Sequence, residues 1–242
     1  MLQGKLSHEW CVPCDLDCIA YDCERREVVL TTQDSRLYCY DLLGKVKWET
    51  KVDSRIQKLQ ICKGQIWTHS NGKIQRYDEG KLKAVLETSS KLWFGDFVIN
   101  SRRICFETYN AKLFRYTLNT LSRTGQLLHT WSYVHRRAAI GFGTEKYVFV
   151  TSEQPGILYK YDWDGTFLEV IKTGEDTLEP VRLIEHGKFL YVSSREKSDL
   201  VSVLNEEGVF LKRVELQWKG VHKCIDEPVY MQVNGSWVSL YS

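Results

Sequence analysis

The chain has little of what would divide it or anchor it in a membrane. Proline accounts for only 4 of its 242 residues, and no low-complexity tract or polar linker marks a domain boundary. No apolar run approaches the roughly 18 residues of a membrane-spanning helix. The formal net charge is only +2, which by itself does not indicate nucleic-acid binding. These absences predict one domain over residues 1–242.

Targeting and catalytic signals are missing as well. Residues 1–10 carry no apolar segment of the kind found in secretory signal peptides, so we expect an intracellular protein, cytoplasmic or nuclear. The sequence contains no Gly-x-Ser-x-Gly elbow, phosphate-binding loop, dinucleotide fingerprint or His-Glu-x-x-His motif. Its six histidines are scattered, without the spacing of metal ligands. We therefore expect no catalytic residues, no bound metal and no cofactor.

What the chain does have is a repeat. Six glycines follow one another at intervals of roughly 36 to 45 residues, and several stand in the pattern Tyr-Asp, turn, Gly, Lys or Thr, apolar. These marker glycines are Gly4, Gly44, Gly80, Gly125, Gly165 and Gly208. A period of about 40 residues with four short strands in each repeat is the signature of a β-propeller. The sequence therefore predicts an all-β fold, a six-bladed β-propeller with four-stranded blades.

The repeat also runs across the two ends of the chain. Residues 239–242 followed by residues 1–6 match the pattern at residues 39–46. The last unit has only three strand-like segments, and residues 2–10 have the character of the missing outer strand. We expect this N-terminal strand to complete the C-terminal blade and so close the ring, which leaves no open sheet edge at the seam.

The repeats resemble those of NHL-repeat propellers, through turns such as Tyr40-Asp41-Leu42-Leu43-Gly44-Lys45. We take the Gly-His and Trp-Asp dipeptides that mark WD repeats to be absent, which argues against a standard WD-repeat protein. Residues 44–49 also resemble the Trp-docking turn of quinoprotein-type repeats, but only at this one place. The resemblance implies a propeller fold, and fold alone says little about function.

Two hypotheses, a calcium-dependent hydrolase and a zinc site, can be tested on the sequence. Six-bladed propellers that hydrolyse lactones bind calcium with converging oxygen ligands at the tunnel mouth. Here only one unit offers carboxylates at the corresponding place, Asp15 and Asp17, and most of the others offer cations. The eight cysteines include four near the start, Cys11, Cys14, Cys18 and Cys23. Strand spacing separates Cys18 from Cys23 by well over 10 Å, at about 3.3 Å per residue, too far for one tetrahedral zinc site.

Two interpretations of Cys11 and Cys14 stay open: two metal ligands or a redox pair, or reduced thiols packed near the core of an intracellular protein.

The candidate binding residues lie on one predicted face. That face is formed by the loops from each outer strand to the next inner strand and by the hairpins between second and third strands. Its cations and aromatics are of the kinds enriched in interaction hot spots. The predicted partner-binding residues are Arg55, Lys91, Trp131, Tyr133, His135, Arg136, Arg137, Arg182, Trp218, Lys219 and His222.

These residues also have structural alternatives. Trp131 or Tyr133 would equally cap a sheet interface, and Arg136 and Arg137 would pair with the acidic segment 175–179. The opposite face carries basic pairs of its own, Arg25-Arg26 and Arg102-Arg103.

We therefore expect a non-enzymatic interaction scaffold, or a subunit of a larger complex, that binds an acidic or phosphorylated segment of a protein partner. The alternative is an RNA-binding propeller, which the NHL resemblance implies because several such propellers bind single-stranded RNA on the corresponding surface. A second alternative is a hydrolase at the tunnel mouth. RNA binding should weaken steeply with salt, whereas binding of an aromatic-anchored peptide should weaken much less.

Overall fold

The structure is a computed structural model. It describes residues 6–22, 24–87, 93–110, 115–132, 138–152, 154, 156–173, 180–186, 189–194, 200–215, 221–226, 229–234 and 237–241. Every regular element among them is a β-strand, and none of them forms a helix able to cross a membrane.

The described strands form four-stranded antiparallel sheets, six in all, in which sequence neighbours pair. This confirms the prediction of an all-β fold with four-stranded blades.

Two of the sheets lie between residues 16 and 87, one combines residues 6–11 with residues 221–241, and three lie between residues 93 and 215. The first three are β2 (Leu16–Asp22), β3 (Glu27–Thr32), β4 (Arg36–Asp41) and β5 (Val46–Lys51); β6 (Lys58–Cys62), β7 (Gln65–Ser70), β8 (Lys73–Asp78) and β9 (Lys81–Glu87); and β22 (Val221–Asp226), β23 (Val229–Asn234), β24 (Trp237–Tyr241) and β1 (Leu6–Cys11). The others are β10 (Trp93–Ile99), β11 (Arg103–Asn110), β12 (Arg115–Ser122) and β13 (Leu127–Ser132); β14 (Ala138–Gly143), β15 (Tyr147–Ser152), β16 (Ile157–Asp162) and β17 (Phe167–Lys172); and β18 (Pro180–His186), β19 (Phe189–Ser194), β20 (Leu200–Asn205) and β21 (Phe210–Glu215).

The chain divides into two compact units of three sheets each. Unit 1 spans Lys91–Lys219, and unit 2 combines Leu2–Ser90 with Gly220–Ser242. Within unit 1 the inner strand β14 contacts β10 and β18, and within unit 2 the inner strand β2 contacts β6 and β22. Consecutive sheets therefore pack side by side within each unit.

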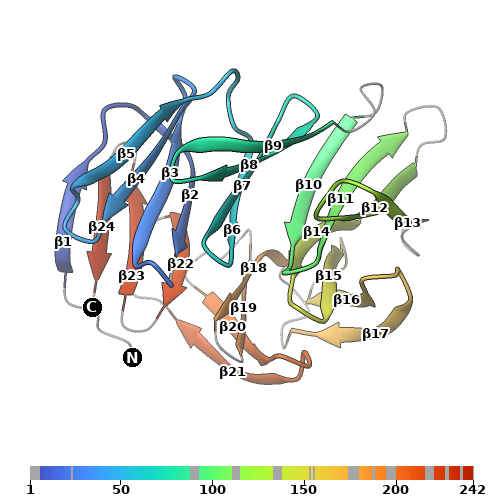
Figure 1. The fold of residues 1–242 in the computed structure, drawn as a ribbon. Coiled ribbons are helices and arrows are strands. Elements are labelled where there is room, and N and C mark those ends of the chain that lie inside the picture. Colours follow the sequence, from blue (N-terminus) through green and yellow to red (C-terminus); the bar gives the residue numbers. More distant parts are fainter. Residues whose placement is uncertain are drawn as a thin grey trace. The chain divides into compact units, whose positions relative to one another are not determined.

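The N-terminal strand completes the C-terminal sheet. β1 pairs antiparallel with β24, from Leu6 opposite Tyr241 to Cys11 opposite Trp237, and Figure 1 shows the two strands side by side. The strand runs over residues 6–11, slightly later than the expected span of 2–10. The pairing of the two chain ends, predicted from the repeat, is thus present.

The repeated Tyr-Asp turn has a physical basis in three sheets. Oδ1 of Asp41 accepts hydrogen bonds from the backbone N–H groups of Leu43 and Lys45, both 2.9 Å away. Asp162 does the same two and four residues further on, and so does Asn205. In each turn the marker glycine has positive φ, from 78° to 92°. A short side-chain acceptor and a glycine are what this turn needs.

The marker glycines also hold neighbouring sheets together. A Cβ placed on Gly44 would lie 2.8 Å from Cγ of Trp10 on β1, the outer strand of the preceding sheet. The same overlap would occur between Gly80 and Trp48, Gly165 and Trp131, and Gly208 and Ile171. In four places, therefore, a large side chain from one outer strand lies directly on the glycine turn of the next sheet.

A β-bulge lies near the start of the outer strand of all six described sheets. The residue three positions after each marker glycine has no ladder partner, because the register shifts there. The bulge residues are Ser7, Lys47 and Lys83 in unit 2, and Leu128, Leu168 and Leu211 in unit 1. Bulges of this kind interrupt the regular hydrogen-bonding edge of a strand.

Candidate interaction face

Two loops and the start of an inner strand meet at one end of the β2–β5 sheet. The backbone N–H of Val52 donates to the carbonyl of Ser35 over 2.9 Å, and that of Gln33 donates to the carbonyl of Asp15 over 3.1 Å. These bonds bring the outer-strand loop and the β3–β4 hairpin together, as expected for the predicted interaction face.

Arg55 is the predicted site residue that the structure describes most fully on this face. Its Nε donates to Oδ2 of Asp17 over 2.7 Å and its Nη2 to Oδ1 over 2.5 Å. The Asp17 side chain is 7% exposed and that of Arg55 is 62% exposed. The bond to Asp17 raises the pKa of Arg55. A buried carboxylate thus fixes the orientation of an exposed guanidinium, and it also neutralises part of its charge.

A second arginine on this face is held in a similar way. Arg36 contacts Asp34 at 3.2 Å and forms an ion pair with Glu49 across the β4–β5 ladder. Thr32 donates to Asp34 over 2.5 Å, which is the main cause of a lowered pKa for Asp34. The described part of the face therefore alternates acids and bases and is not uniformly cationic.

Trp131 has a structural contact. Its ring centroid lies 4.8 Å from that of Tyr161, its Nε1 donates to Oγ1 of Thr120 over 3.4 Å, and it rests on Gly165 of the next sheet. The side chain remains half-buried. Trp131 therefore packs at a sheet interface, which is the structural alternative raised from the sequence.

The remaining predicted residues are only partly placed. Arg182 lies on β18 opposite Ser193, and His222 lies on β22 opposite Gln232. The following fall outside the described residues: Lys91, Tyr133, His135, Arg136, Arg137, Trp218 and Lys219.

The opposite face also pairs its charges. Arg25 lies 3.5 Å from Asp78, and Arg103 and His129 share the carboxylate of Asp164, with 3.1 Å from His129 Nε2. One arginine of each basic pair predicted for this face therefore has an acidic partner: Arg25 in the first and Arg103 in the second.

None of the six cysteines whose side chains the structure describes forms a disulfide bond. Cys11 is exposed, Cys14 and Cys18 are half-buried, and Cys39 and Cys105 are buried. Burial raises the pKa of Cys105 to about 12, and burial together with a bond to Glu27 raises that of Cys39. No group of three or more possible metal ligands occurs among the described residues.

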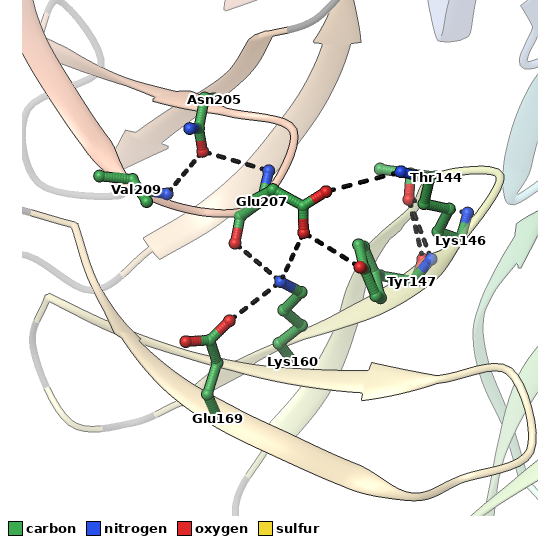
Figure 2. A network of polar contacts seen from close by, with 8 residues as sticks. All are labelled: Thr144, Lys146, Tyr147, Lys160, Glu169, Asn205, Glu207 and Val209. Atoms are coloured by element: carbon green, nitrogen blue, oxygen red, sulfur yellow. Dashed lines mark hydrogen bonds and ion pairs between the residues drawn. The ribbon is translucent and has the colours of Figure 1, made fainter.

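The most elaborate polar contact links two sheets of unit 1 (Figure 2). Nζ of Lys160 donates to Glu169 over 2.9 Å and to the carbonyl of Glu207 over 2.8 Å, and it lies 4.1 Å from the centre of the Tyr147 ring. The Tyr147 hydroxyl donates to Glu207 over 3.0 Å. This junction, defined by Lys160, Glu169, Glu207 and Tyr147, fastens the β20–β21 turn to the preceding sheet.

We expect Lys160→Met to lower the free energy of unfolding by about 2 kcal/mol, because it removes a buried ammonium that satisfies three acceptors. Lys146→Met, which removes a 3.5 Å contact of an exposed lysine with Glu207, should change it by less than about 0.5 kcal/mol. Urea denaturation of both variants measures the difference. Equal effects would contradict the role given to Lys160.

The junction also predicts a pH dependence. Burial lowers the pKa of Lys160, but its bonds to Glu169 and Glu207 outweigh burial and raise it. The bond from Tyr147 is the main cause of a lowered pKa for Glu207. A carboxyl group whose pKa is lower in the folded than in the unfolded protein stabilises the fold while it is ionised. We therefore expect the contribution of Glu207 to stability to be lost as the pH falls below about 4.5.

Consecutive four-stranded sheets, clasped through glycine turns, define the class of this protein: it is a β-propeller. Among solved structures, the WD40 β-propeller domain of Doa1 is similar, with a TM-score of 0.61 and 15% sequence identity, over 94% of this chain and 78% of that one. At this identity the likeness shows the fold alone. No protein-family model matches the chain, and no curated protein matches its sequence.

The expectation that Trp-Asp dipeptides are absent is wrong at one place. There the sequence has Trp163-Asp164, in the turn after β16. Trp163 is buried and its Nε1 donates to the carbonyl of Thr144 over 3.1 Å, so it serves packing between the β14–β15 turn and β16.

Proposed function

We propose that this propeller is a non-enzymatic protein-interaction scaffold, cytoplasmic or nuclear and part of a larger complex. Its partner is an acidic or phosphorylated protein segment, bound at the loop face. The contact of Arg55 with Asp17 carries the proposal: the guanidinium uses Nε and Nη2 for Asp17, which leaves Nη1 for a carboxylate or phosphate of the partner. Such charge-assisted bonds are strong and directional.

Orientation before binding is what makes this arginine suitable. A free arginine loses rotamer freedom when it binds a partner, and a fixed one has already lost it. Arg36, between Asp34 and Glu49, adds a second fixed guanidinium on the same face. The predicted contributions of Lys91, Tyr133, Arg136, Arg137 and Trp218 belong to the same proposal.

We also propose that the six sheets form one closed, six-bladed ring over residues 1–242, with repeats of the NHL kind. The pairing of β1 with β24 supports closure. The four contacts in which a large side chain of one outer strand lies on the marker glycine of the next sheet support it as well. A closed ring would place all the inter-sheet loops around one tunnel mouth.

Binding of two labelled probes tests the proposal: an acidic peptide with one phosphoserine, and a single-stranded RNA of similar length. We expect Arg55→Ala to weaken peptide binding roughly five- to tenfold, as the loss of one charge-assisted contact predicts. Lys45→Ala is the matched control, because Lys45 is an exposed cation in the turn at the other end of β4. Fluorescence anisotropy measures both.

Three outcomes would contradict the proposal. Equal loss in the two variants would indicate non-specific charge. Binding of RNA alone, with a steep fall as log salt rises, would favour the nucleic-acid alternative. Unchanged peptide affinity in Arg55→Ala would place the binding surface away from Arg55.

A further inference from the structure

Two cysteines lie on the connection between β1 and β2, and the function proposed above uses neither. Cys11 is the last residue of β1, and Cys14 stands two residues before β2 begins at Leu16. The side chain of Cys11 is exposed and that of Cys14 is half-buried. Two thiols separated by two residues have the spacing of pairs that undergo thiol–disulfide exchange. Whether these two can pair depends on the path of the chain between them.

The chain bends between the two cysteines. It changes direction at Pro13 and again at Cys14, whereas a continued strand would carry the two Cα atoms about 10 Å apart. Disulfides join Cα atoms roughly 4.4–6.8 Å apart, so the bend moves the pair towards that range. Val12, which is 2% exposed, packs in a buried cluster with Trp10. This packing anchors the middle of the connection.

The same buried cluster places both thiols beside one strand. Tyr38 and Tyr40 of β4 belong to it together with Val12, and the centroids of their rings lie 5.9 Å apart. Burial is the main cause of the raised pKa of both phenols. Cys11 contributes to the rise at Tyr40, and Cys14 contributes to the rise at Tyr38. Each thiol is therefore near one of two adjacent rings on the same face of β4.

The two thiols differ in access and in their partners. Sγ of Cys11 donates to the carbonyl of Val12 over 3.4 Å, and its side chain is open to solvent. Partial burial is the main cause of a raised pKa for Cys14, and the carboxylate of Asp34, to which its thiol hydrogen-bonds, contributes. Cys11 is therefore the thiol that a dissolved disulfide reaches first, and Cys14 is the resolving thiol.

We propose that Cys11 and Cys14 are a reversible redox site that exchanges with low-molecular-weight disulfides such as oxidised glutathione. The Cys11 thiolate attacks one sulfur of the reagent, the S–S bond of the reagent breaks, and one glutathione thiolate leaves. The Cys14 thiolate then attacks Sγ of Cys11, and the second glutathione thiolate leaves. Two protein thiols are oxidised to one disulfide, and one oxidised glutathione is reduced to two thiols. The two protons that the cysteines lose are gained by the two glutathione thiolates.

Oxidation also changes a contact on the loop face. The new S–S bond takes the Cys14 thiol away from Asp34, and Asp34 contacts Arg36 at 3.2 Å. The redox state of the pair is thereby linked to a side chain of the predicted interaction face. The exchange itself does not depend on the function proposed above, because it needs only the two thiols and the bend that holds them.

Equilibration with glutathione tests the proposal. The folded protein is incubated in mixtures of reduced and oxidised glutathione, the remaining thiols are alkylated, and peptide mass spectrometry maps every cysteine. We expect one disulfide, between Cys11 and Cys14, which dithiothreitol reverses. Its equilibrium constant should be roughly tenfold or more above that of a synthetic peptide of residues 8–16, because the fold already holds the bend that the free peptide must form.

Three variants separate the roles of the thiols. Cys14→Ser should stop with one glutathione bound to Cys11, and Cys11→Ser should slow the reaction at this site roughly tenfold or more. Cys18→Ser is the matched control. The thiol of Cys18 is also half-buried and close in sequence, but it donates to the carbonyl of Gln57 over 3.4 Å. The disulfide should therefore form unchanged in this variant.

Each of the following results would overturn the proposal. A wild-type protein that stops with glutathione on Cys11 would show that the fold holds the two thiols apart. An equal or larger equilibrium constant in the peptide would show that the fold does not favour the pair. A disulfide that forms only in urea, or that joins a different pair of cysteines, would exclude this site in the folded protein. Thermal melts check that the three variants stay folded.

Discussion

Gly165→Ala is expected to lower the free energy of unfolding by about 3 kcal/mol or more. The residue has a φ of 91°, which an L side chain rarely adopts. A Cβ would also overlap the indole ring of Trp131, itself packed 4.8 Å from Tyr161. In a chain of this size, the change corresponds to a fall in melting temperature of roughly 6–12 °C.

A double-mutant cycle separates the two causes. If overlap with the ring matters, Gly165→Ala should cost clearly less when Trp131→Ala has removed the ring. Guanidinium denaturation of the four proteins gives the coupling. An equal loss of stability in both backgrounds would mean that backbone strain alone causes it. That result would contradict a stabilising contact between Trp131 and Gly165.

Deletion of residues 1–11 is expected to cost more than about 4 kcal/mol, close to the whole stability of many domains. It removes all of β1 and leaves β24 with an open edge. It also removes Trp10, which is buried against Tyr40 and lies on Gly44. We expect broadened melting and aggregation in the truncated protein.

Complementation tests whether pairing is the cause. A synthetic peptide with residues 1–11, added to the truncated protein, should restore the melting transition in a concentration-dependent way, because it binds only the folded state. A peptide with Trp10→Ala should restore it less. A truncated protein that melts cooperatively at the wild-type temperature would contradict the importance of β1.

The sequence predicted the turns and strands because their requirements are local. A positive φ beside a large side chain admits little other than glycine, so the marker glycines stand out at regular spacing. The clasping residues were harder to find. Trp10, Trp48, Trp131 and Ile171 share a position and not an identity, so a search for a repeated tryptophan motif recognises only some of them.

The candidate site shows the limit of local patterns. Arg55 was identified from its loop position, but its pairing with Asp17, 38 residues earlier, depends on how two sheets pack. The same carboxylate had been weighed only as a calcium ligand. The bulges were missed because lysine and leucine at one position look unrelated until the ladder register is known.

The pairing of β1 with β24 also has a consequence for protein synthesis. β1 leaves the ribosome well before its described ladder partner, β24, which lies more than about 220 residues later in the chain. At 5–20 residues per second, the wait is on the order of tens of seconds. During that interval β1, with Trp10, cannot form its native pairing with β24. The nascent chain therefore exposes an unpaired, partly apolar strand that is prone to aggregate, and a chaperone would be expected to bind it.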